Sequence, residues 1–221
     1  MRRILHENGL SIALFGLFLA FLLLQSIAGW RTENQSNEEH RQPVESYARY
    51  LRSGSFVEAT FENWESEFLQ MAGYVVLTVL LRQKGSPESK DLEKPEPVDE
   101  DPREARDRPG VPGPVRRGGL ALGVYQHSLA LALTGLFLMS FLLHAVGGHA
   151  EYNQEQLQHG EAPVSLIGFV TSAPFWFQSM QNWQSEFLAV FALVVLGIFL
   201  RQRGSPESKP VAAAHAQTGS S

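Results

Sequence analysis

The chain has no cysteine among its 221 residues, and this absence excludes several kinds of chemistry. Disulfides, thiolate nucleophiles, iron–sulfur ligation and cysteine-based zinc sites all require the thiol. A formal net charge of −5 leaves no basic surface of the kind that nucleic acid requires. The chain also lacks a phosphate-binding loop, a serine nucleophile elbow and the metalloprotease helix signature. We therefore predict a protein that is not an enzyme, needs no cofactor or metal and binds no nucleic acid.

Apolar residues gather in four blocks, although the mean hydropathy of −0.11 is that of a soluble protein. Leu10 to Gly29 is a run of 20 residues without charge. As a helix it reaches about 30 Å, the thickness of the hydrocarbon core of a bilayer. The second block, Phe68 to Leu81, has only 14 residues, so its helix must begin near Phe61 to span. The sequence predicts an all-α membrane protein with four transmembrane helices, at about residues 10–29, 61–81, 125–148 and 180–200.

The first apolar run also has features of a secretory signal peptide. Arg2 and Arg3 form a basic start, and Ser26-Ile27-Ala28 resembles a cleavage site. The corresponding run of the second half, Leu129 to Gly148, lies in the middle of the chain, where no signal peptide is expected. We therefore interpret the first run as a retained transmembrane helix.

The segment Asn63 to Lys90 recurs 119 residues later as Asn182 to Lys209, with 18 of 28 positions identical. Both copies begin with Asn-Trp-x-Ser-Glu-Phe-Leu and end with Arg-Gln-(Lys/Arg)-Gly-Ser-Pro-Glu-Ser-Lys. The same offset aligns Gly16 to Leu19 with Gly135 to Leu138. Similarity at one fixed offset indicates an internal duplication. We predict two hairpin units of two spans each, over residues 1–82 and 118–203.

Two segments outside these units are predicted to be disordered, the linker at residues 83–117 and the tail at residues 204–221. The linker contains seven prolines among dense charges and almost no apolar residues. Such a stretch cannot bury enough surface to offset the entropy lost on ordering. We interpret it as a connector between two equivalent units.

The distribution of basic residues predicts the orientation. Of the 18 lysines and arginines, 9 lie in residues 82–117, 3 from Arg201 onward and 2 before the first span. Residues 149–186 contain none, and residues 30–60 contain 4. The amino terminus, linker and tail are therefore predicted to be cytoplasmic, with both hairpins in the same orientation. The first outer loop is expected to contain a short helix with Tyr47 and Tyr50, lying in the headgroup region or packed on its own loop.

The repeated motif supplies six candidate site residues: Asn63, Trp64, Glu67, Asn182, Trp183 and Glu186. On a helix, the Asn and Glu of each copy share one stripe, and the Trp lies on the next. A carboxylate at the boundary of a span is costly unless it is solvated, hydrogen-bonded or paired. The motif therefore has three interpretations: an interface anchor, a contact between the helices of the two halves, or a cation or proton site where Glu67 and Glu186 meet. The anchor interpretation is favoured because Trp is enriched at membrane interfaces.

Two histidines, His144 and His149, lie near the outer end of the third predicted span. Their spacing of five residues separates them around a helix, and their counterparts in the first half are Gln25 and Trp30. We interpret them as polar packing or interface residues and not as metal ligands.

The two hairpins and the doubled motif resemble an uncharacterised family of small bacterial integral membrane proteins, classed as a domain of unknown function. The resemblance covers almost the whole chain apart from the linker and tail. It implies a location in the bacterial cytoplasmic membrane and a four-span fold. It carries no catalytic residues that could be transferred to this chain.

We predict a multi-pass protein of the bacterial cytoplasmic membrane that has a structural or interaction role. Its expected partners are the lipid bilayer, a second copy of the chain or another membrane protein. The alternative is a small transporter or channel-like protein that uses Glu67 and Glu186 near the outer face. The first is favoured because the second and fourth spans have only Gln70 and Thr78 as polar residues beyond the motif.

Overall fold

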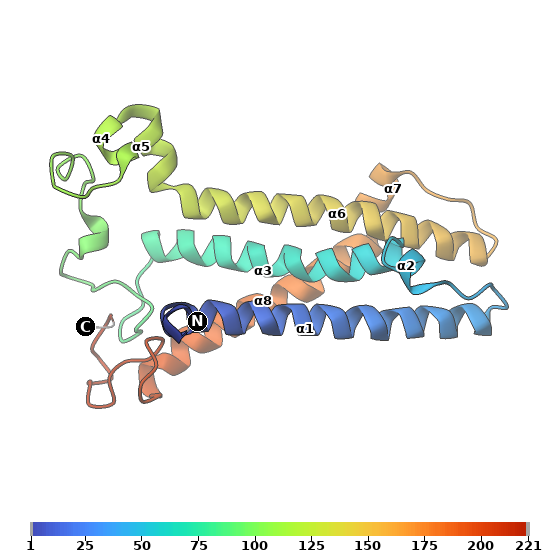
Figure 1. The fold of residues 1–221 in the computed structure, drawn as a ribbon, viewed down its shortest axis with the longest axis horizontal. Coiled ribbons are helices and arrows are strands. Elements are labelled where there is room, and N and C mark those ends of the chain that lie inside the picture. Colours follow the sequence, from blue (N-terminus) through green and yellow to red (C-terminus); the bar gives the residue numbers. More distant parts are fainter. Residues whose placement is uncertain (1, 220–221) are drawn as a thin grey trace. The chain divides into compact units, whose positions relative to one another are not determined.

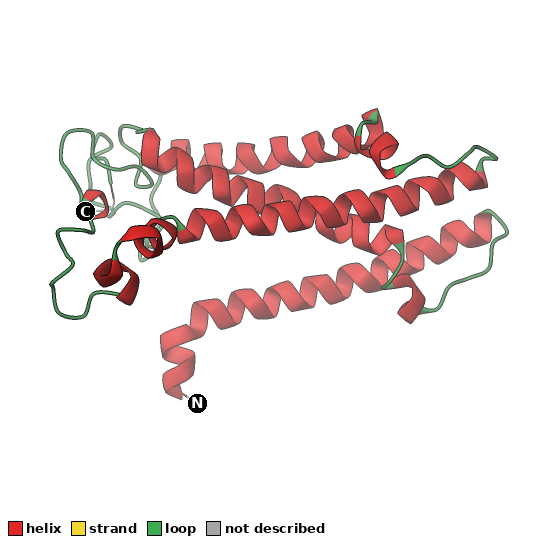
Figure 2. Ribbon diagram, turned by 90° about the horizontal axis from the view of Figure 1, so that it is seen from above, coloured by secondary structure: helices red, strands yellow, loops and turns green. Residues whose placement is uncertain are grey.

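The computed structural model describes residues 2–219, which form helices and turns without a single strand (Figures 1 and 2). The predicted all-α fold class is confirmed. The elements are α1 (Arg2–Glu39), α2 (Tyr47–Tyr50), α3 (Gly54–Leu80), the 3-10 helix η1 (Pro97–Asp99), α4 (Gly113–Arg117), α5 (Gly119–Gln126), α6 (Ser128–Gln158), α7 (Leu166–Val170) and α8 (Ala173–Phe199).

Three of these helices, α1, α6 and α8, are long and apolar enough to cross a membrane. They indicate a membrane protein. Helix α3 also has 27 residues, but its first half carries Glu58, Glu62, Glu65 and Glu67, which lower its mean hydropathy. A fourth span at α3 therefore stays a prediction.

The long helices extend beyond the predicted spans. Helix α1 continues to Glu39, well past the predicted end at Gly29, and α3 begins at Gly54 and not near Phe61. Before α6, the chain turns at His127, whose backbone is not helical. Apolar runs predict the part of a helix that suits lipid, whereas the helix itself continues through polar residues until a turn ends it.

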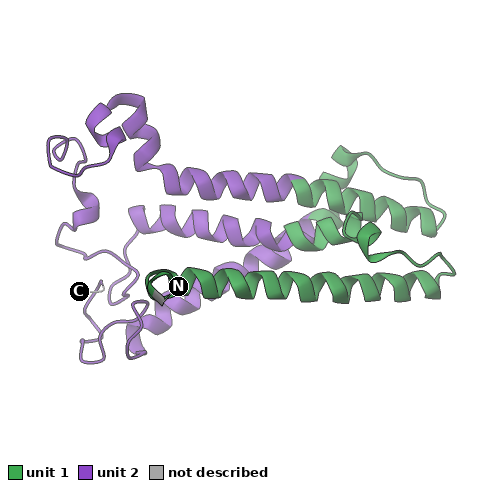
Figure 3. Cartoon of the chain, in the orientation of Figure 1, with its two compact units in different colours: residues 1–61, 143–175 green, residues 62–142, 176–221 purple. Residues whose placement is uncertain are grey.

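The chain divides into two compact units (Figure 3). Unit 1 comprises residues 1–61 and 143–175, and unit 2 comprises residues 62–142 and 176–221. Each unit therefore takes segments from both halves of the chain. Helices α3, α6 and α8 contribute to both units, and each unit is described by itself below.

Unit 1 contains the loops that close the two hairpins, which we call the first cap (residues 29–56) and the second cap (residues 148–175). The Asn34 side chain clamps the backbone of Glu45: its Nδ2 donates to the carbonyl oxygen at 3.0 Å, and its Oδ1 accepts the N–H at 2.7 Å. The Asn153 side chain clamps Val164 in the same way, at 3.0 and 2.8 Å. Both residues of the second clamp lie 119 positions after their counterparts.

Further matching contacts support each cap. Trp30 Nε1 donates to the clamped carbonyl oxygen of the first cap at 2.7 Å, and His149 Nε2 lies 2.9 Å from that of the second. Each cap also buries an edge-to-face pair of aromatic rings, Tyr50 with Phe56 at 5.6 Å and Phe169 with Phe175 at 5.4 Å. Tyr50 and Phe169 are 2% and 1% exposed, so these rings form the apolar centre of each cap.

Glycines allow α3 and α6 to cross with their backbones in contact in unit 1. A Cβ atom on Gly54 would lie 2.8 Å from the carbonyl oxygen of Gly147 and from the backbone nitrogen of Glu151. A Cβ atom on Gly147 would lie 2.7 Å from the backbone nitrogen of Glu58. A larger residue would have to push the helices apart, so the crossing depends on both glycines. It also holds the two glutamates close together.

Unit 2 contains the loops that follow α3 and α8, which we call the first and second linker-end loops (residues 82–90 and 201–209). In each loop a serine hydroxyl accepts the N–H of a glutamine six residues earlier, Ser89 from Gln83 at 2.8 Å and Ser208 from Gln202 at 2.9 Å. Both loops turn at a glycine with positive φ, Gly85 (84°) and Gly204 (87°), a backbone conformation that favours glycine.

The tail folds onto the first linker-end loop within unit 2. The Lys209 ammonium group is 1% exposed and donates to backbone carbonyl oxygens, those of Gly85 (2.6 Å), Ala214 (3.4 Å), His215 (2.9 Å) and Gln217 (3.1 Å). In the linker, residues 83–117 form turns together with η1 and α4. The disorder predicted for linker and tail remains a prediction.

Candidate functional site

The six motif residues predicted from the sequence all lie in unit 2. Helix α3 carries Asn63, Trp64 and Glu67, and α8 carries Asn182, Trp183 and Glu186. The side chains of Asn63 and Glu67 are exposed, whereas the other four residues are partly buried.

Three side-chain hydrogen bonds join the motif segments of α3 and α8. Trp183 Nε1 donates to Glu65 Oε1 at 2.8 Å, and the Asn182 amide donates to the Glu62 carboxylate. Slightly farther along, Gln70 Nε2 donates to the backbone carbonyl oxygen of Glu186 at 3.2 Å. The motif segments of α3 and α8 are therefore in contact.

Glu67 and Glu186, the two carboxylates that the repeat singles out, are near enough to interact electrostatically. Neither α3 nor α8 contains a lysine or arginine that could neutralise them from the same helix. The described residues 2–219 include no group of three or more His, Cys, Asp or Glu side chains arranged to hold a metal ion. The pair therefore provides negative charge without a built metal site.

Glu65 is the site residue that the sequence analysis missed. Its side chain is 0% exposed, and neighbouring Ser66 is 1% exposed. A buried carboxylate must be stabilised by hydrogen bonds or by opposite charge. The hydrogen bond from Trp183 is therefore important for the stability of Glu65 in this position. The repeat did not indicate a buried acid at this position, because the residue that matches Glu65 is Gln184, which is exposed. The density of glutamates in the first half of α3 was the available signal.

Aromatic rings enclose Trp183 in unit 2. Phe137 on α6 packs edge-on against it at 6.2 Å, and Trp176 on α8 does the same at 6.2 Å from the other side. The hydroxyl groups of Ser140 and Ser179 are buried near this stripe of residues and have no hydrogen-bond partner. Apolar rings beside the bond from Trp183 to Glu65 lower the local dielectric and strengthen it.

The two histidines of the third predicted span lie in unit 1. His144 is 0% exposed and stacks on the ring of Phe175 at 4.9 Å. His149 lies 2.9 Å from the amide nitrogen of Asn153 and belongs to the second cap. His144 therefore packs on α8, and His149 contacts residues of α6 and of the loop before α7.

A second acidic cluster lies at the glycine crossing of unit 1, outside the apolar part of α6. Burial, followed by the negative charges of Glu33, Glu58 and Glu155, raises the pKa of Glu151 to about 7. A hydrogen bond from the backbone of Ser55 acts in the opposite direction and lowers it. Glu151 therefore exchanges its proton near neutral pH.

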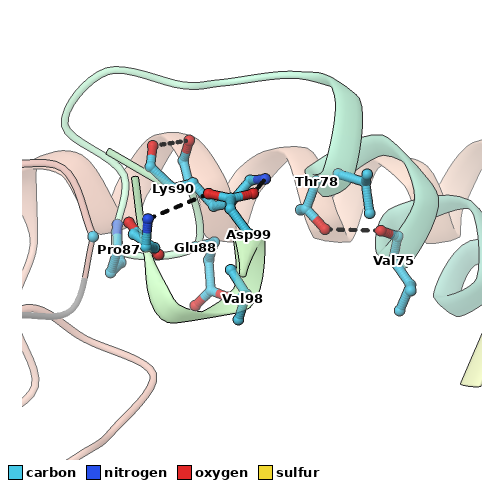
Figure 4. Close-up of a pocket in the computed structure, with 11 residues that line it drawn as sticks. Val75, Thr78, Pro87, Glu88, Lys90, Val98 and Asp99 are labelled. Carbon is cyan, nitrogen blue, oxygen red and sulfur yellow. Dashed lines mark hydrogen bonds and ion pairs between the residues drawn. The ribbon is translucent and has the colours of Figure 1, made fainter. Parts of the chain in front are cut away.

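Two adjoining cavities lie at the end of unit 2 where the linker begins. The polar cavity has a volume of about 470 Å³, and the apolar cavity between α3 and α8 has about 370 Å³. They share Thr78, Glu88 and Ser89. Figure 4 shows the polar cavity, with the Lys90 ammonium group paired to Asp99 and the Glu88 side chain beside Val98.

A family model described as "Domain of unknown function (DUF6766)" matches residues 1–220 of the chain. No curated protein and no solved structure matches it. The match covers both caps, the motif helices and both linker-end loops.

Proposed function

The chain belongs to the family described as "Domain of unknown function (DUF6766)", and from its contacts we propose that it is a four-span membrane protein with a structural or interaction role. The observation that carries this proposal is the set of hydrogen bonds between α3 and α8. Polar side chains of the two motif segments form hydrogen bonds with each other, as they do in contacts that hold membrane helices together.

An internal duplication accounts best for the matched contacts. The Asn clamps, the aromatic pairs and the serine bonds of the linker-end loops recur at positions 119 apart. Two like-oriented hairpins, with termini and linker on the cytoplasmic side, are inferred from this repeat and from the basic residues. The family resemblance implies that the membrane is a bacterial inner membrane. The bilayer, and either a second copy or another membrane protein, are the proposed partners.

The absence of cysteine makes the helix contact directly testable. A Cβ atom on Gly73 would lie 3.4 Å from the Phe187 ring. We expect the double variant Gly73→Cys/Phe187→Cys to be joined in membranes by a short bifunctional thiol reagent. The matched pair Gly73→Cys/Leu188→Cys should stay open because Leu188 points about 100° away around α8. Equal cross-linking of both pairs would reject this contact.

Topology and the linker have separate tests. A reporter fused at the end of the chain should be active only in the cytoplasm, and periplasmic activity would overturn the proposed orientation.

Protease added from the cytoplasmic side should cut within residues 83–117 and leave the helices whole. A resistant linker would contradict its predicted disorder.

The second candidate is a small transporter or channel-like protein, and the electrostatic contact of Glu67 with Glu186 favours it. Protein reconstituted in liposomes with a pH-sensitive dye tests it. Under the structural proposal, no proton or cation flux is expected above that of protein-free liposomes. Transport would be supported if the unchanged protein gave flux and the variant Glu67→Gln/Glu186→Gln abolished it. The variant must give the same yield of folded protein.

A further inference from the structure

The two cavities at the linker end of unit 2 together have the shape and chemistry of one amphipathic site. The apolar cavity is lined on the α3 side by residues such as Tyr74 and Leu77, and on the α8 side by Phe187, Val190 and Phe191. Beyond the cavity, α3 and α8 are joined toward the motif by the bond from Gln70 to Glu186. Toward the loops, Pro87 lies 3.2 Å from the position of a Cβ atom added to Gly197.

Three aromatic rings line the apolar cavity beside aliphatic side chains, with Tyr74 on one wall and Phe187 and Phe191 on the other. The faces of such rings are electron-rich and attract cations, most strongly where water is excluded. A volume of about 370 Å³ accommodates an organic body of several rings or branches.

Glu88 lies at the junction of the two cavities and supplies a negative charge. Its Oε2 accepts a hydrogen bond from the Tyr74 hydroxyl at 3.3 Å. Burial raises the pKa of Glu88, and the nearby charge of Glu207 raises it further. A cation bound beside this carboxylate would stabilise its ionised form.

The remaining charges of the lining leave the site net negative. The polar cavity adds Glu96 and Asp99, and of these Asp99 is already paired with Lys90. The only other cation in the lining is Arg82, whose guanidinium group donates to the backbone carbonyl oxygens of Val79 and Leu81. Within the described part of unit 2, the bonds of Lys90 and Arg82 go to these other partners and not to Glu88.

We propose that this junction binds an amphipathic organic cation, with the apolar body between α3 and α8 and the positive head beside Glu88. Aromatic walls, a partly buried carboxylate and a net negative lining favour this class over an anionic lipid. A neutral acyl chain would use the walls but would leave Glu88 without a partner. The proposal rests on unit 2 alone and does not require the structural role proposed above.

Tetraphenylphosphonium is a suitable probe because it combines a single positive charge with an aromatic body. Full-length protein in nanodiscs of zwitterionic phosphatidylcholine should bind the radiolabelled probe saturably. Glu88→Gln should weaken binding by about tenfold, since it removes the charge and retains the shape. Binding should also weaken as the pH falls and Glu88 takes up a proton, with Tyr74 and Glu207 as the groups that face it.

The repeat supplies a matched control. Glu207 occupies the same Gly-Ser-Pro-Glu-Ser-Lys sequence as Glu88 but does not line either cavity. Glu207→Gln should bind the probe within about threefold of the unchanged protein, because it alters only a neighbouring charge. Equal loss in both variants would mean that the loops, and not this site, control binding.

A neutral analogue keeps the proposal testable even if Glu88→Gln fails to fold. Triphenylphosphine oxide has a similar body without the charge, and the unchanged protein should bind it at least about tenfold more weakly than the cation. If both compounds bind equally, the cavity accepts apolar groups such as lipid chains without regard to charge, and the proposal is wrong. The proposal is also wrong if neither compound binds.

Discussion

The indole N–H of Trp183 donates to a carboxylate oxygen of Glu65 at 2.8 Å, so a residue of the repeated motif in one half satisfies a buried acid in the other. This bond joins α8 to α3 in a part of unit 2 where the rings of Phe137 and Trp176 pack edge-on against Trp183. Its loss would leave a buried acceptor short of a donor, which costs more than the bond contributes when present.

Trp183→Phe is therefore expected to destabilise the protein by about 1.5–3 kcal/mol. Phenylalanine keeps an aromatic ring at this position but is smaller than tryptophan, so the effect combines the missing donor with a small loss of packing. Thermal unfolding in detergent, followed by tryptophan fluorescence and size-exclusion chromatography, measures it. Gln184→Ala is the control, because that exposed position matches Glu65 in the repeat and should change stability by less than about 0.5 kcal/mol. Equal losses in the two variants would argue against the bond.

The Asn clamps of the two caps should be equivalent in energy. Asn34→Ala and Asn153→Ala each remove two hydrogen bonds to a loop backbone and should each cost about 1–3 kcal/mol. Limited proteolysis of the loops between residues 40–46 and 159–165 should accelerate accordingly. The adjacent exposed glutamines provide controls, Gln35→Ala and Gln154→Ala, which should leave the cleavage rates unchanged. An unchanged cleavage rate in either Asn→Ala variant would show that the Asn side chain does not hold that cap.

The glycine crossing predicts a sharp contrast within one helix. Gly147→Ala places a Cβ atom 2.7 Å from the backbone of Glu58 and should destabilise by about 1–3 kcal/mol. Gly135→Ala, also in α6, meets no atom within 4 Å and should be neutral or stabilising, because alanine favours the helix. Thermal unfolding of both variants checks this, and similar melting temperatures would contradict the close contact.

Glu151 predicts how stability changes with pH. Its pKa in the folded protein, about 7, is raised above the ordinary glutamate value of 4.5, so the folded state holds this proton more tightly than the unfolded state. Its stabilisation is fully present below about pH 4.5 and is lost as the pH rises through about 7. For a partly exposed side chain we expect a loss of about 1–2 kcal/mol between pH 5 and pH 8.

Glu151→Gln tests this assignment, because the amide cannot ionise and should flatten the dependence between pH 5 and pH 8. Glu161→Gln, an exposed substitution in the second cap, should leave the slope as it is. The slope is read from unfolding temperatures in detergent at several pH values. A Glu151→Gln protein with an unchanged slope would place the responsible proton elsewhere.

The sequence predicted what depends on periodicity and repetition, and missed what depends on packing between helices. The helical class and the apolar cores of α1, α6 and α8 follow from uncharged runs of sufficient length. The meeting of the two motif copies was one of three open interpretations, because spacing places Asn182 and Trp183 on a helix face without saying which helix that face contacts. Glu65 was overlooked for the same reason. Its burial is decided by Trp183, a residue 118 positions away, and not by its own neighbours in the chain.

The cage of carbonyl oxygens around Lys209 limits how the chain can be labelled. Three of its four acceptors, on Ala214, His215 and Gln217, come from residues after Lys209 itself. A tag or reporter joined directly to Lys209 would replace them and leave a buried ammonium group with Gly85 alone. Any fusion intended to report on this arrangement should therefore retain the residues that follow Lys209, including Ala214, His215 and Gln217.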